Sequence, residues 1–402
     1  MSQQSMRSCD CTRVPGSRAS AEHTPRANVA SRIVRQRYTP YGGAERFVER
    51  ALAALATRGV DLTLVTRQWP GGADAAVTPL VVNPAYFGRT MRDATFARGV
   101  CTALAKLPGT LVQSHERIDC CDIYRAGDGV HAVWVEERMR GANAAQRLAL
   151  AASPYHRYTM AAERRLFASP RLREVICISR MVQDEIHDRF GLARERLPVI
   201  YNAIDPGVFN PGLAVHRADT RSRLGIAQDA VVFLLLGSEY ARKGVGRALE
   251  ALRHVTAPAH LLVVGRDRHP SRYVALAQRL GVLPRVTFAG PQKDPRPFYG
   301  AADVFVLPTL YDALSNAVLE ALACGLPVIT SDRCGAGELV VAHGAGIVCG
   351  ARDIGALAQA MTAMLAPAVR SGMGRNALGA VADLTPPAMA ARLVALYERL
   401  LA

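Results

Sequence analysis

One stretch near the C-terminal end, residues 303–330, constrains the fold of this sequence more than any other. It opens with an apolar run typical of a buried strand, DVFVL, and continues through a polar loop into the helix-forming segment NAVLEALA. Ser315 stands where a helix N-cap is expected and Gly325 where the helix should end, and a second apolar run, PVITS, follows. A strand, a helix and a second strand in this order predict one unit of a parallel sheet.

The same alternation of strands and helices fills two long blocks of the chain. The expected strands of the first block cover residues 31–37, 60–66, 80–83, 110–114, 174–179 and 198–202, and those of the second block cover residues 230–237, 260–265, 286–290, 303–308, 327–331 and 346–349. A chain of 402 residues is long enough for two domains with cores of their own. We therefore expect an α/β protein with two parallel-sheet domains, residues 29–203 and 230–384, that face each other across a cleft.

The remaining segments are expected to connect or extend these domains. Residues 1–28 predict a disordered tail, and residues 204–229, with two prolines and little periodicity, predict an interdomain linker. Residues 385–402 have an amphipathic pattern, which predicts a final helix that packs back across the domains.

The chain shows no segment suited to secretion or to membrane insertion. Its tail lacks the apolar stretch of a signal peptide, and no apolar run reaches the ~18–20 residues that span a bilayer. Nine cysteines are an odd number without a C-x2-C zinc spacing, so we expect free, mostly buried thiols in a reducing compartment. These features predict a cytoplasmic protein.

The net charge of +15 predicts an anionic partner. Most of the basic residues are arginines, a skew that genomic base composition alone can produce. No basic run is interleaved with aromatic residues, which argues against nucleic acid. An anionic membrane surface or a phosphorylated glycolipid fits better, with the Arg-rich segment 137–174 either as a docking face or as an ordinary solvated surface.

Residues at the ends of two expected strands suit a phosphorylated ligand. Ser315 and Asn316 begin a helix, whose unpaired N–H groups can hold phosphate. Arg242 and Lys243 follow the strongest predicted strand and can neutralise a pyrophosphate.

Two further pairs of residues suit a sugar nucleotide. Gly42 and Gly43 lie between the first expected strand and helix, where glycines either let the backbone approach a phosphate or simply make a tight turn. Asp312 and Glu320, eight residues apart, can bind sugar hydroxyls on either side of that phosphate.

This acid-x7-acid spacing, with Gly-Leu-Pro-Val after the helix, resembles the motif of the retaining glycosyltransferases of family 4, which have the GT-B fold of two Rossmann-like domains. The resemblance implies that Glu320 binds the ribose of a nucleotide sugar and that Asp312 lies beside the donor sugar. It also implies that Gly42 and Gly43, the arginine–lysine pair and the helix start contact the donor diphosphate. Asp312 stands where the family has Glu, which leaves the identity of the sugar open.

Residues 114–138 resemble one subgroup of this family, the lipopolysaccharide core α-1,3-glucosyltransferases, which add glucose from UDP-glucose to an inner-core heptose. That resemblance implies that Asp128 lies near the reacting centre. The resemblance to family 4 as a whole makes His131 a candidate contact of the donor sugar. A single histidine is more often a structural residue than a ligand contact. This applies even more to His115 than to His131.

Together these features predict a retaining, metal-independent hexosyltransferase without a cofactor, with Asp128, Asp312, Arg242 and Lys243 as its catalytic residues. No two aspartates have the D-x-D spacing of a metal–diphosphate clamp, which agrees with this prediction. The expected partners are a nucleotide sugar and a lipopolysaccharide core or similar glycan acceptor, met at the inner face of the cytoplasmic membrane.

Other functions stay open. An enzyme of the same fold could use GDP-mannose, ADP-heptose or UDP-GlcNAc, or could be a nucleotide-sugar epimerase. A catalytically silent nucleotide-sugar-binding protein is a further alternative. A dehydrogenase is disfavoured, because GVGRAL lacks the third glycine of a dinucleotide fingerprint.

Overall fold

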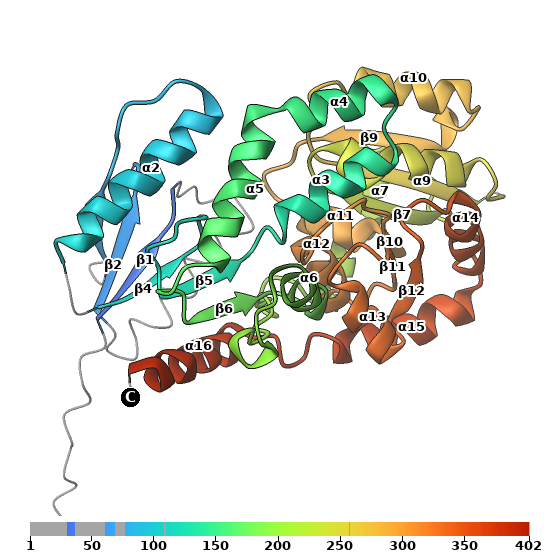
Figure 1. Cartoon of the computed structure of the whole chain (residues 1–402). Coiled ribbons are helices and arrows are strands. Elements are labelled where there is room, and N and C mark those ends of the chain that lie inside the picture. Colours follow the sequence, from blue (N-terminus) through green and yellow to red (C-terminus); the bar gives the residue numbers. More distant parts are fainter. Residues whose placement is uncertain (1–29, 37–60, 69–76, 108–109, 257, 402) are drawn as a thin grey trace, which may run out of the picture.

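The computed structural model describes residues 30–36, 61–68, 77–107, 110–256 and 258–401. Within these ranges the chain forms two six-stranded sheets whose neighbouring strands are all parallel (Figure 1). The expected α/β class with two parallel sheets is therefore confirmed. The predicted tail, Gly42, Gly43 and the helix expected to follow them lie outside the described residues.

The first sheet has the strand order β3-β2-β1-β4-β5-β6. Its strands are β1 (Ala30–Val34), β2 (Asp61–Thr66), β3 (Val77–Val81), β4 (Leu111–Ser114), β5 (Ile123–Ala126) and β6 (Glu174–Cys177). Its helices are α2 (Gly88–Ala105), α3 (His131–Arg140), α4 (Ala144–Ala152), α5 (Pro154–Phe167) and α6 (Arg180–Phe190). Every residue of β4, β5 and β6 is buried, as expected for a parallel sheet covered on both faces.

The second sheet has the order β12-β11-β10-β7-β8-β9. Its strands are β7 (Val231–Leu236), β8 (Ala259–Val264), β9 (Val286–Gly290), β10 (Val304–Leu307), β11 (Val328–Ser331) and β12 (Gly346–Cys349). The helices around it are α8 (Tyr240–Lys243), α9 (Val245–Leu252), α10 (Ser271–Arg279), α11 (Arg296–Ala301), α12 (Asn316–Ala323), α13 (Gly337–His343), α14 (Ile354–Ala363) and α15 (Pro367–Gly379).

Both sheets have the order of a doubly wound fold, in which the first and fourth strands of each half lie side by side. Connections leave these central strands in opposite directions, so a crevice opens beyond their carboxyl ends. The crevice lies beyond β1 and β4 in the first half and beyond β7 and β10 in the second. The loops that follow these strands therefore hold the residues best placed to bind a ligand.

The segment expected to be a linker contains regular structure of its own. It forms the 3-10 turn η2 (Pro211–His216) and the helix α7 (Arg217–Arg223). The guanidinium groups of Arg217 and Arg221 bind the two carboxylate oxygens of Asp303, at 2.6 and 2.7 Å. These contacts attach the segment to the second domain just before β10.

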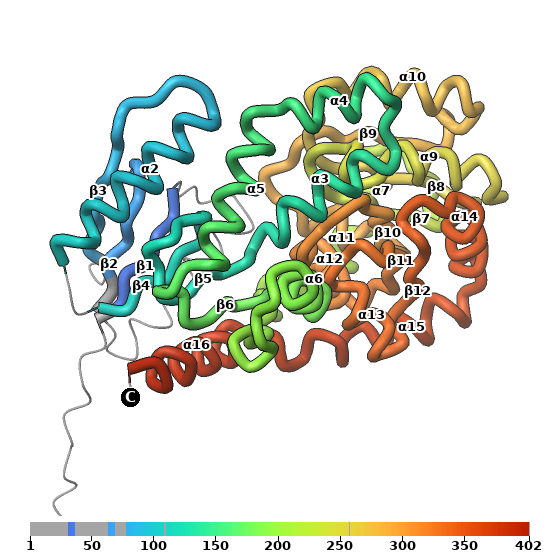
Figure 2. The backbone as a smooth tube through the Cα atoms, in the orientation of Figure 1, coloured from blue at the N-terminus to red at the C-terminus, as the bar shows by residue number. Residues whose placement is uncertain are grey.

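The last helix, α16 (Pro386–Leu401), returns to the first domain, as the red end of the tube in Figure 2 shows. Five of its apolar side chains pack against Ile33, Leu64 and Ile176 on one face of the first sheet. The Tyr397 hydroxyl also donates a 2.8 Å hydrogen bond to Gln113 of β4. The helix therefore covers a face that would otherwise expose apolar strand residues.

Helix α6 belongs to the first half of the chain, but its N-terminus contacts the second domain. Ser179 donates a 2.8 Å hydrogen bond to the Ala313 carbonyl oxygen. Glu338 of α13 accepts the backbone N–H groups of Arg180 and Met181, so a carboxylate of the second domain caps α6. The two domains thus share polar contacts at the start of α6.

The strand predictions differ from the structure at two places in the first domain. The chain forms β5, which was not predicted, because its four residues contain a charged Arg125 and fall short of a recognisable apolar run. Residues 198–202 were expected to form a strand, but they contribute only a single bridge between Val199 and Cys177. Most of residues 131–167 are helical and form α3, α4 and α5.

The cysteines are only partly as expected. Cys101 of α2 and Cys120 form a disulfide, so the prediction of free thiols is wrong for this pair. The packing of α2 brings their Cα atoms to 5.7 Å, a contact between residues 19 apart that no local pattern indicates. The other described cysteines are free and buried. None of the helices in the described ranges has both the length and the apolar character needed to cross a membrane.

Candidate active site

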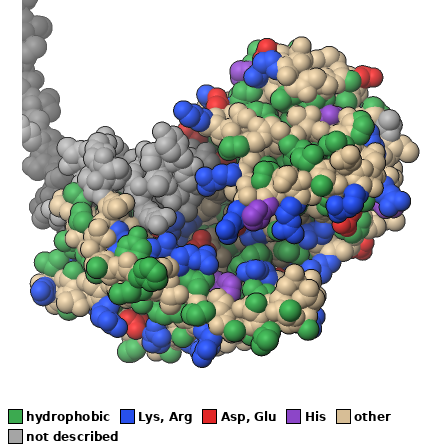
Figure 3. Space-filling view, turned by 90° about the horizontal axis from the view of Figure 1, so that it is seen from above, with side chains coloured by type: hydrophobic (Ala, Val, Ile, Leu, Met, Phe, Trp, Pro, Cys, Tyr) green, Lys and Arg blue, Asp and Glu red, His purple; other side chains and the backbone are tan. Residues whose placement is uncertain are grey.

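A cleft of about 1400 Å³ opens between the two domains at the carboxyl ends of their strands. Figure 3 shows basic side chains gathered around this hollow. The basic residues that line it are Arg89, Arg117, Arg125, Arg138, Arg242, Lys243, Arg247 and Arg352. Among the described residues only Asp128, Glu239 and Asp312 add carboxylates to the lining. The cleft therefore suits an anionic ligand.

The second domain contributes a carboxylate held by two cations. The Lys243 Nζ atom lies 2.5 Å from Asp312 Oδ2, and a guanidinium nitrogen of Arg242 lies 3.6 Å from the same oxygen. Burial opposes the ionisation of Asp312, but these two cations hold its pKa below the usual range. Asp312 is therefore an anion in the folded protein, and three predicted catalytic residues meet at one point.

Short-range backbone geometry places these cations. Glu239 precedes α8 with a φ of 63°, and Gly244 follows it with a φ of 85°. A Cβ atom at Gly244 would lie 2.0 Å from the carbonyl oxygen of Pro308, so only glycine fits. The loop after β7 is thus pressed against the loop after β10, which brings Arg242 and Lys243 to the acid.

The N-terminus of α12 has a hydroxyl, that of Ser315, which can donate a hydrogen bond to an oxyanion. Ser315 is the N-cap residue, but its hydroxyl does not cap the helix. The side chain is 2% exposed, and its Oγ atom has no hydrogen-bond partner among the described residues. A buried, unpaired hydroxyl at a helix N-terminus that lines the cleft fits a phosphate oxygen, which the helix dipole also favours.

Asn316 is held from the first domain. Its Oδ1 atom accepts a 2.6 Å hydrogen bond from Asn202, which in turn accepts one from Arg125. Arg125 is buried on β5, and burial together with the nearby Arg35 lowers its pKa to about 9. Sequence analysis missed Arg125, although a charged residue between apolar neighbours is the signal that could have found it.

Glu320 lies deeper in α12 than the residues at the helix start. It is 4% exposed, and its Oε2 atom accepts a 2.7 Å hydrogen bond from the Tyr299 hydroxyl. Glu320 is not among the described residues that line the cleft. Its role at a nucleotide ribose stays a prediction.

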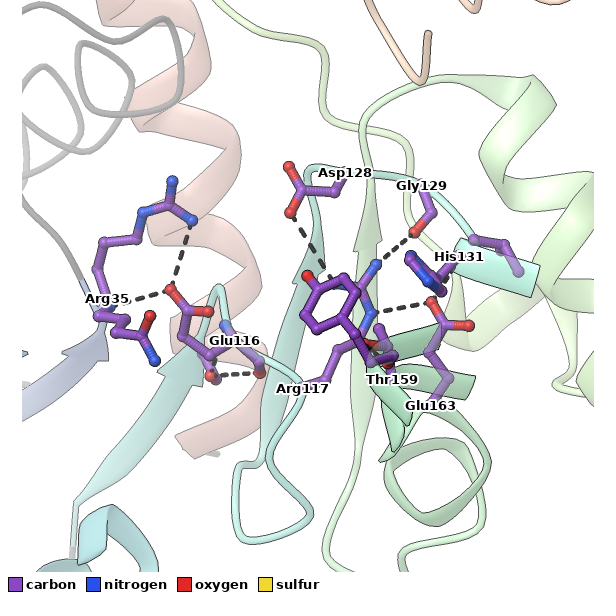
Figure 4. A network of polar contacts seen from close by, with 12 residues as sticks. Arg35, Glu116, Arg117, Asp128, Gly129, His131, Thr159 and Glu163 are labelled. Carbon is purple, nitrogen blue, oxygen red and sulfur yellow. Dashed lines mark hydrogen bonds and ion pairs between the residues drawn. The ribbon is translucent and has the colours of Figure 1, made fainter. Parts of the chain in front are cut away.

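The first domain presents Asp128 in the loop between β5 and α3, with its side chain 68% exposed (Figure 4). The guanidinium of Arg117 lies 3.9 Å from Asp128, 2.9 Å from Glu163 and 3.3 Å from the Gly129 carbonyl oxygen. Glu163 also accepts the backbone N–H of His131 at 2.7 Å and so anchors the first turn of α3. Sequence analysis missed Arg117 and Glu163, because the pair joins residues 46 positions apart.

His131 lines the cleft as a neutral ring. Its Nε2 atom lies 2.9 Å from His156 Nδ1, and burial and the charge of Arg117 lower its pKa to about 3. His131 can therefore exchange hydrogen bonds with a ligand at neutral pH but brings no charge. His115 is buried beside Gln113 and is not among the described residues that line the cleft.

Two arginines of the first domain line the cleft without forming an ion pair among the described residues. The Arg89 guanidinium lies 4.5 Å from the centre of the Tyr155 ring, and that of Arg138 lies 5.7 Å from the Trp134 ring. Aromatic contacts of this kind hold the side chains in place without neutralising their charge. This side of the cleft therefore suits an anionic substituent.

One group of possible metal ligands occurs among the described residues, formed by Cys101, Asp119 and Cys120. Its two cysteines are joined in the disulfide, and none of the three lines the cleft.

Two family models match the chain. "Glycosyltransferase Family 4" matches residues 41–208, and "Glycosyl transferases group 1" matches residues 230–367. Each model covers most of one sheet-containing half.

Known proteins and structures resemble the chain over most of its length. The lipopolysaccharide glucosyltransferase WaaG of Escherichia coli (strain K12) is 28% identical over 320 residues, which are 78% of this chain and 83% of that protein. The crystal structure of WaaG matches with a TM-score of 0.77 at 24% identity and covers 91% of this chain and 99% of that one. HepE of Anabaena in complex with UDP-glucose matches with a TM-score of 0.68 at 18% identity and covers 92% and 99%. These likenesses show a shared two-domain fold.

Proposed function

This chain belongs to glycosyltransferase family 4 and has the GT-B fold, and on that premise we propose that it transfers glucose from UDP-glucose to a heptose of the lipopolysaccharide core. One observation carries the proposal: the Lys243–Asp312–Arg242 cluster lines the same cleft as the Ser315 hydroxyl, which has no hydrogen-bond partner among the described residues. Cations and a helix N-terminus together suit a diphosphate.

In the proposed complex the UDP diphosphate lies between Ser315 and the two cations. Lys243 and Arg242 stabilise the negative charge that develops on the diphosphate as its bond to the sugar breaks. Asp312 keeps both cations oriented and faces the donor sugar. The protein then supplies mainly electrostatic stabilisation of the transition state, and no step requires a metal ion.

We propose that the sugar keeps its anomeric configuration. The acceptor hydroxyl oxygen bonds to C1 on the face from which the diphosphate departs, and its proton passes to the departing phosphate oxygen. Asp128 orients the acceptor hydroxyl from the first domain, which its exposed position in the cleft supports. His131, as a neutral ring, offers a hydrogen bond to a donor-sugar hydroxyl.

The acceptor assignment rests on the name of WaaG and on the charge of the first domain. Arg89 and Arg138 suit a phosphate group carried by the acceptor, since neither forms an ion pair with a carboxylate of the described residues. Phe87 is 91% exposed beside Arg89, and Tyr86 and Met91 are also exposed. An aromatic and basic surface of this kind supports peripheral contact with the anionic inner face of the cytoplasmic membrane.

A panel assay tests the proposal. Purified protein is given UDP-glucose, UDP-GlcNAc, GDP-mannose or ADP-heptose, each with and without heptose-terminated lipopolysaccharide, in the presence of EDTA. We expect transfer from UDP-glucose alone, with NMR showing a retained anomeric configuration. Transfer from another donor would reject the donor assignment, and loss of transfer in EDTA would reject metal independence. Binding of UDP without turnover from any donor would favour a silent binding protein.

A further inference from the structure

Tyr311, the residue before Asp312, lies buried between the two domains and is 3% exposed. Its hydroxyl accepts a 2.9 Å hydrogen bond from the backbone N–H of Val130, in the loop that carries Asp128. Its backbone carbonyl accepts a 3.4 Å hydrogen bond from Arg242. One residue therefore contacts a diphosphate cation through its main chain and the opposite loop through its side chain.

The loop of the first domain is shaped to receive this hydroxyl. Gly129 has a φ of +69°, and a Cβ atom there would lie 2.1 Å from the Tyr311 hydroxyl oxygen. Any other residue at position 129 would be strained and would displace the tyrosine. The close approach of Tyr311 thus depends on a glycine next to Asp128.

The same hydroxyl has a second partner, in α6. It donates a 2.7 Å hydrogen bond to Oε2 of Glu185, whose other oxygen is buried without a hydrogen-bond partner among the described residues. The Tyr311 hydroxyl therefore both accepts and donates, and its two partners fix its direction. Loss of the hydroxyl would leave the buried N–H of Val130 and the half-buried carboxylate of Glu185 each without this partner.

We propose that Tyr311 is a positioning residue of the transfer reaction, which holds the Asp128 loop at a fixed distance from the donor site around Asp312. This role rests on the proposed function, because it matters only if a sugar passes between the two halves of the cleft. Bond formation requires the reacting atoms to be held about 3–3.5 Å apart, and a small misplacement costs orders of magnitude in rate. Tyr311 supplies this restraint through the two hydrogen bonds of its hydroxyl.

Tyr311→Phe is the direct test, because it keeps the ring and removes only the hydroxyl. We expect kcat for transfer to fall at least tenfold, while the Kd for UDP, measured by calorimetry, stays within twofold. Tyr397→Phe is the matched control: its hydroxyl is also buried and also joins distant segments, through the bond to Gln113. This control should lose comparable thermal stability and keep its kcat.

Equal kcat values for Tyr311→Phe and Tyr397→Phe would overturn the proposal. If Tyr311→Phe does not fold, two variants of Glu185 test the positioning role instead. Glu185→Gln keeps an acceptor for the hydroxyl and should keep kcat within threefold, whereas Glu185→Ala should lower kcat with the Kd for UDP unchanged. Equal kcat values for these two variants would also overturn it.

A separate readout distinguishes this inference from the proposed function. A wild-type protein that transfers no sugar from any donor contradicts the proposed function alone. Amide hydrogen exchange over residues 128–134 then tests the contact itself. Faster exchange there in Tyr311→Phe, but not in Tyr397→Phe, supports the positioning role, and unchanged exchange overturns it.

Discussion

At the scale of single residues, Lys243 bears most of the proposed chemistry. It is the cation nearest to Asp312, and its side chain is only 11% exposed, so water does little to screen its charge. Lys243→Ala should lower kcat roughly 100- to 1000-fold. This corresponds to a rise of about 2.7–4 kcal/mol in the activation free energy, as for the loss of an oxyanion-hole donor. Steady-state kinetics with UDP-glucose would measure this loss.

Lys293→Ala is the control for that experiment, because Lys293 is exposed and is not among the described residues lining the cleft. It should match the wild type in kcat and melting temperature. A Lys243→Ala protein with a near-normal kcat would show that the cluster with Asp312 stabilises the fold rather than the leaving group.

Glu185 gives a prediction of pH dependence. Burial raises the pKa of its carboxyl to about 7 in the folded protein, against an ordinary value of about 4.3. The folded state therefore holds the proton more tightly than the unfolded chain, and the free energy of unfolding falls as pH rises from about 4.3 through about 7. Glu185→Gln lacks this titration, so between pH 5 and pH 8 the wild type should lose stability relative to the variant, by roughly 2–4 kcal/mol at most.

Thermal unfolding of the wild type and Glu185→Gln across that pH range would show whether the wild type loses stability relative to the variant as pH rises. A stability difference that stays constant with pH would mean that Glu185 titrates normally, and its buried contact with Tyr311 would then need another description.

The residues that sequence analysis could identify are those whose roles are set locally. Arg242, Lys243, Asp312 and Ser315 each follow a predicted strand, and a doubly wound sheet brings such loops together. The Tyr311–Glu185 bond joins residues 126 positions apart. No local pattern encodes such a contact, because it depends on how the two domains are placed against each other.

At the scale of elements, the N-terminus of α12 can be tested without disturbing the fold. The Ser315 hydroxyl has no hydrogen-bond partner among the described residues, so Ser315→Ala should change the melting temperature little. One hydrogen bond to a charged phosphate is worth about 1.5–3 kcal/mol, so the Kd for UDP should rise roughly 10- to 150-fold. Calorimetry with UDP would measure it.

Asp353→Ala is the contrasting variant, because the Asp353 side chain does cap its helix, α14, through the Ala356 N–H. It should lose about 1 kcal/mol of stability and keep its affinity for UDP. If Ser315→Ala instead loses stability and keeps UDP affinity, the helix start is not the phosphate site.

The elements themselves were predictable where their residues are apolar in long runs. All six strands of the second sheet were expected, since each is a run of mostly apolar residues. The predictions fail where tertiary contacts determine the secondary structure. Strand β5 forms because it pairs with β4 and β6. Helix α7 lies in the expected linker, and its Arg221 forms an ion pair with Asp303. Propensity alone cannot show either contact.

At the scale of the whole molecule, the two domains are held together by elements that cross between them. Glu338 of the second domain caps α6, α16 covers the first sheet, and one buried apolar cluster includes residues of both sheets. The cleft is therefore bounded by two packed bodies that these elements join. A sugar donor on one body and an acceptor on the other would meet across it.

A crystal structure with UDP bound would show directly which groups of the cleft hold the diphosphate. We predict that a phosphate oxygen lies about 3 Å from Ser315 Oγ and that Lys243 and Arg242 face the diphosphate. A diphosphate bound elsewhere, with the Lys243–Asp312 pair untouched and Ser315 still unpaired, would contradict it.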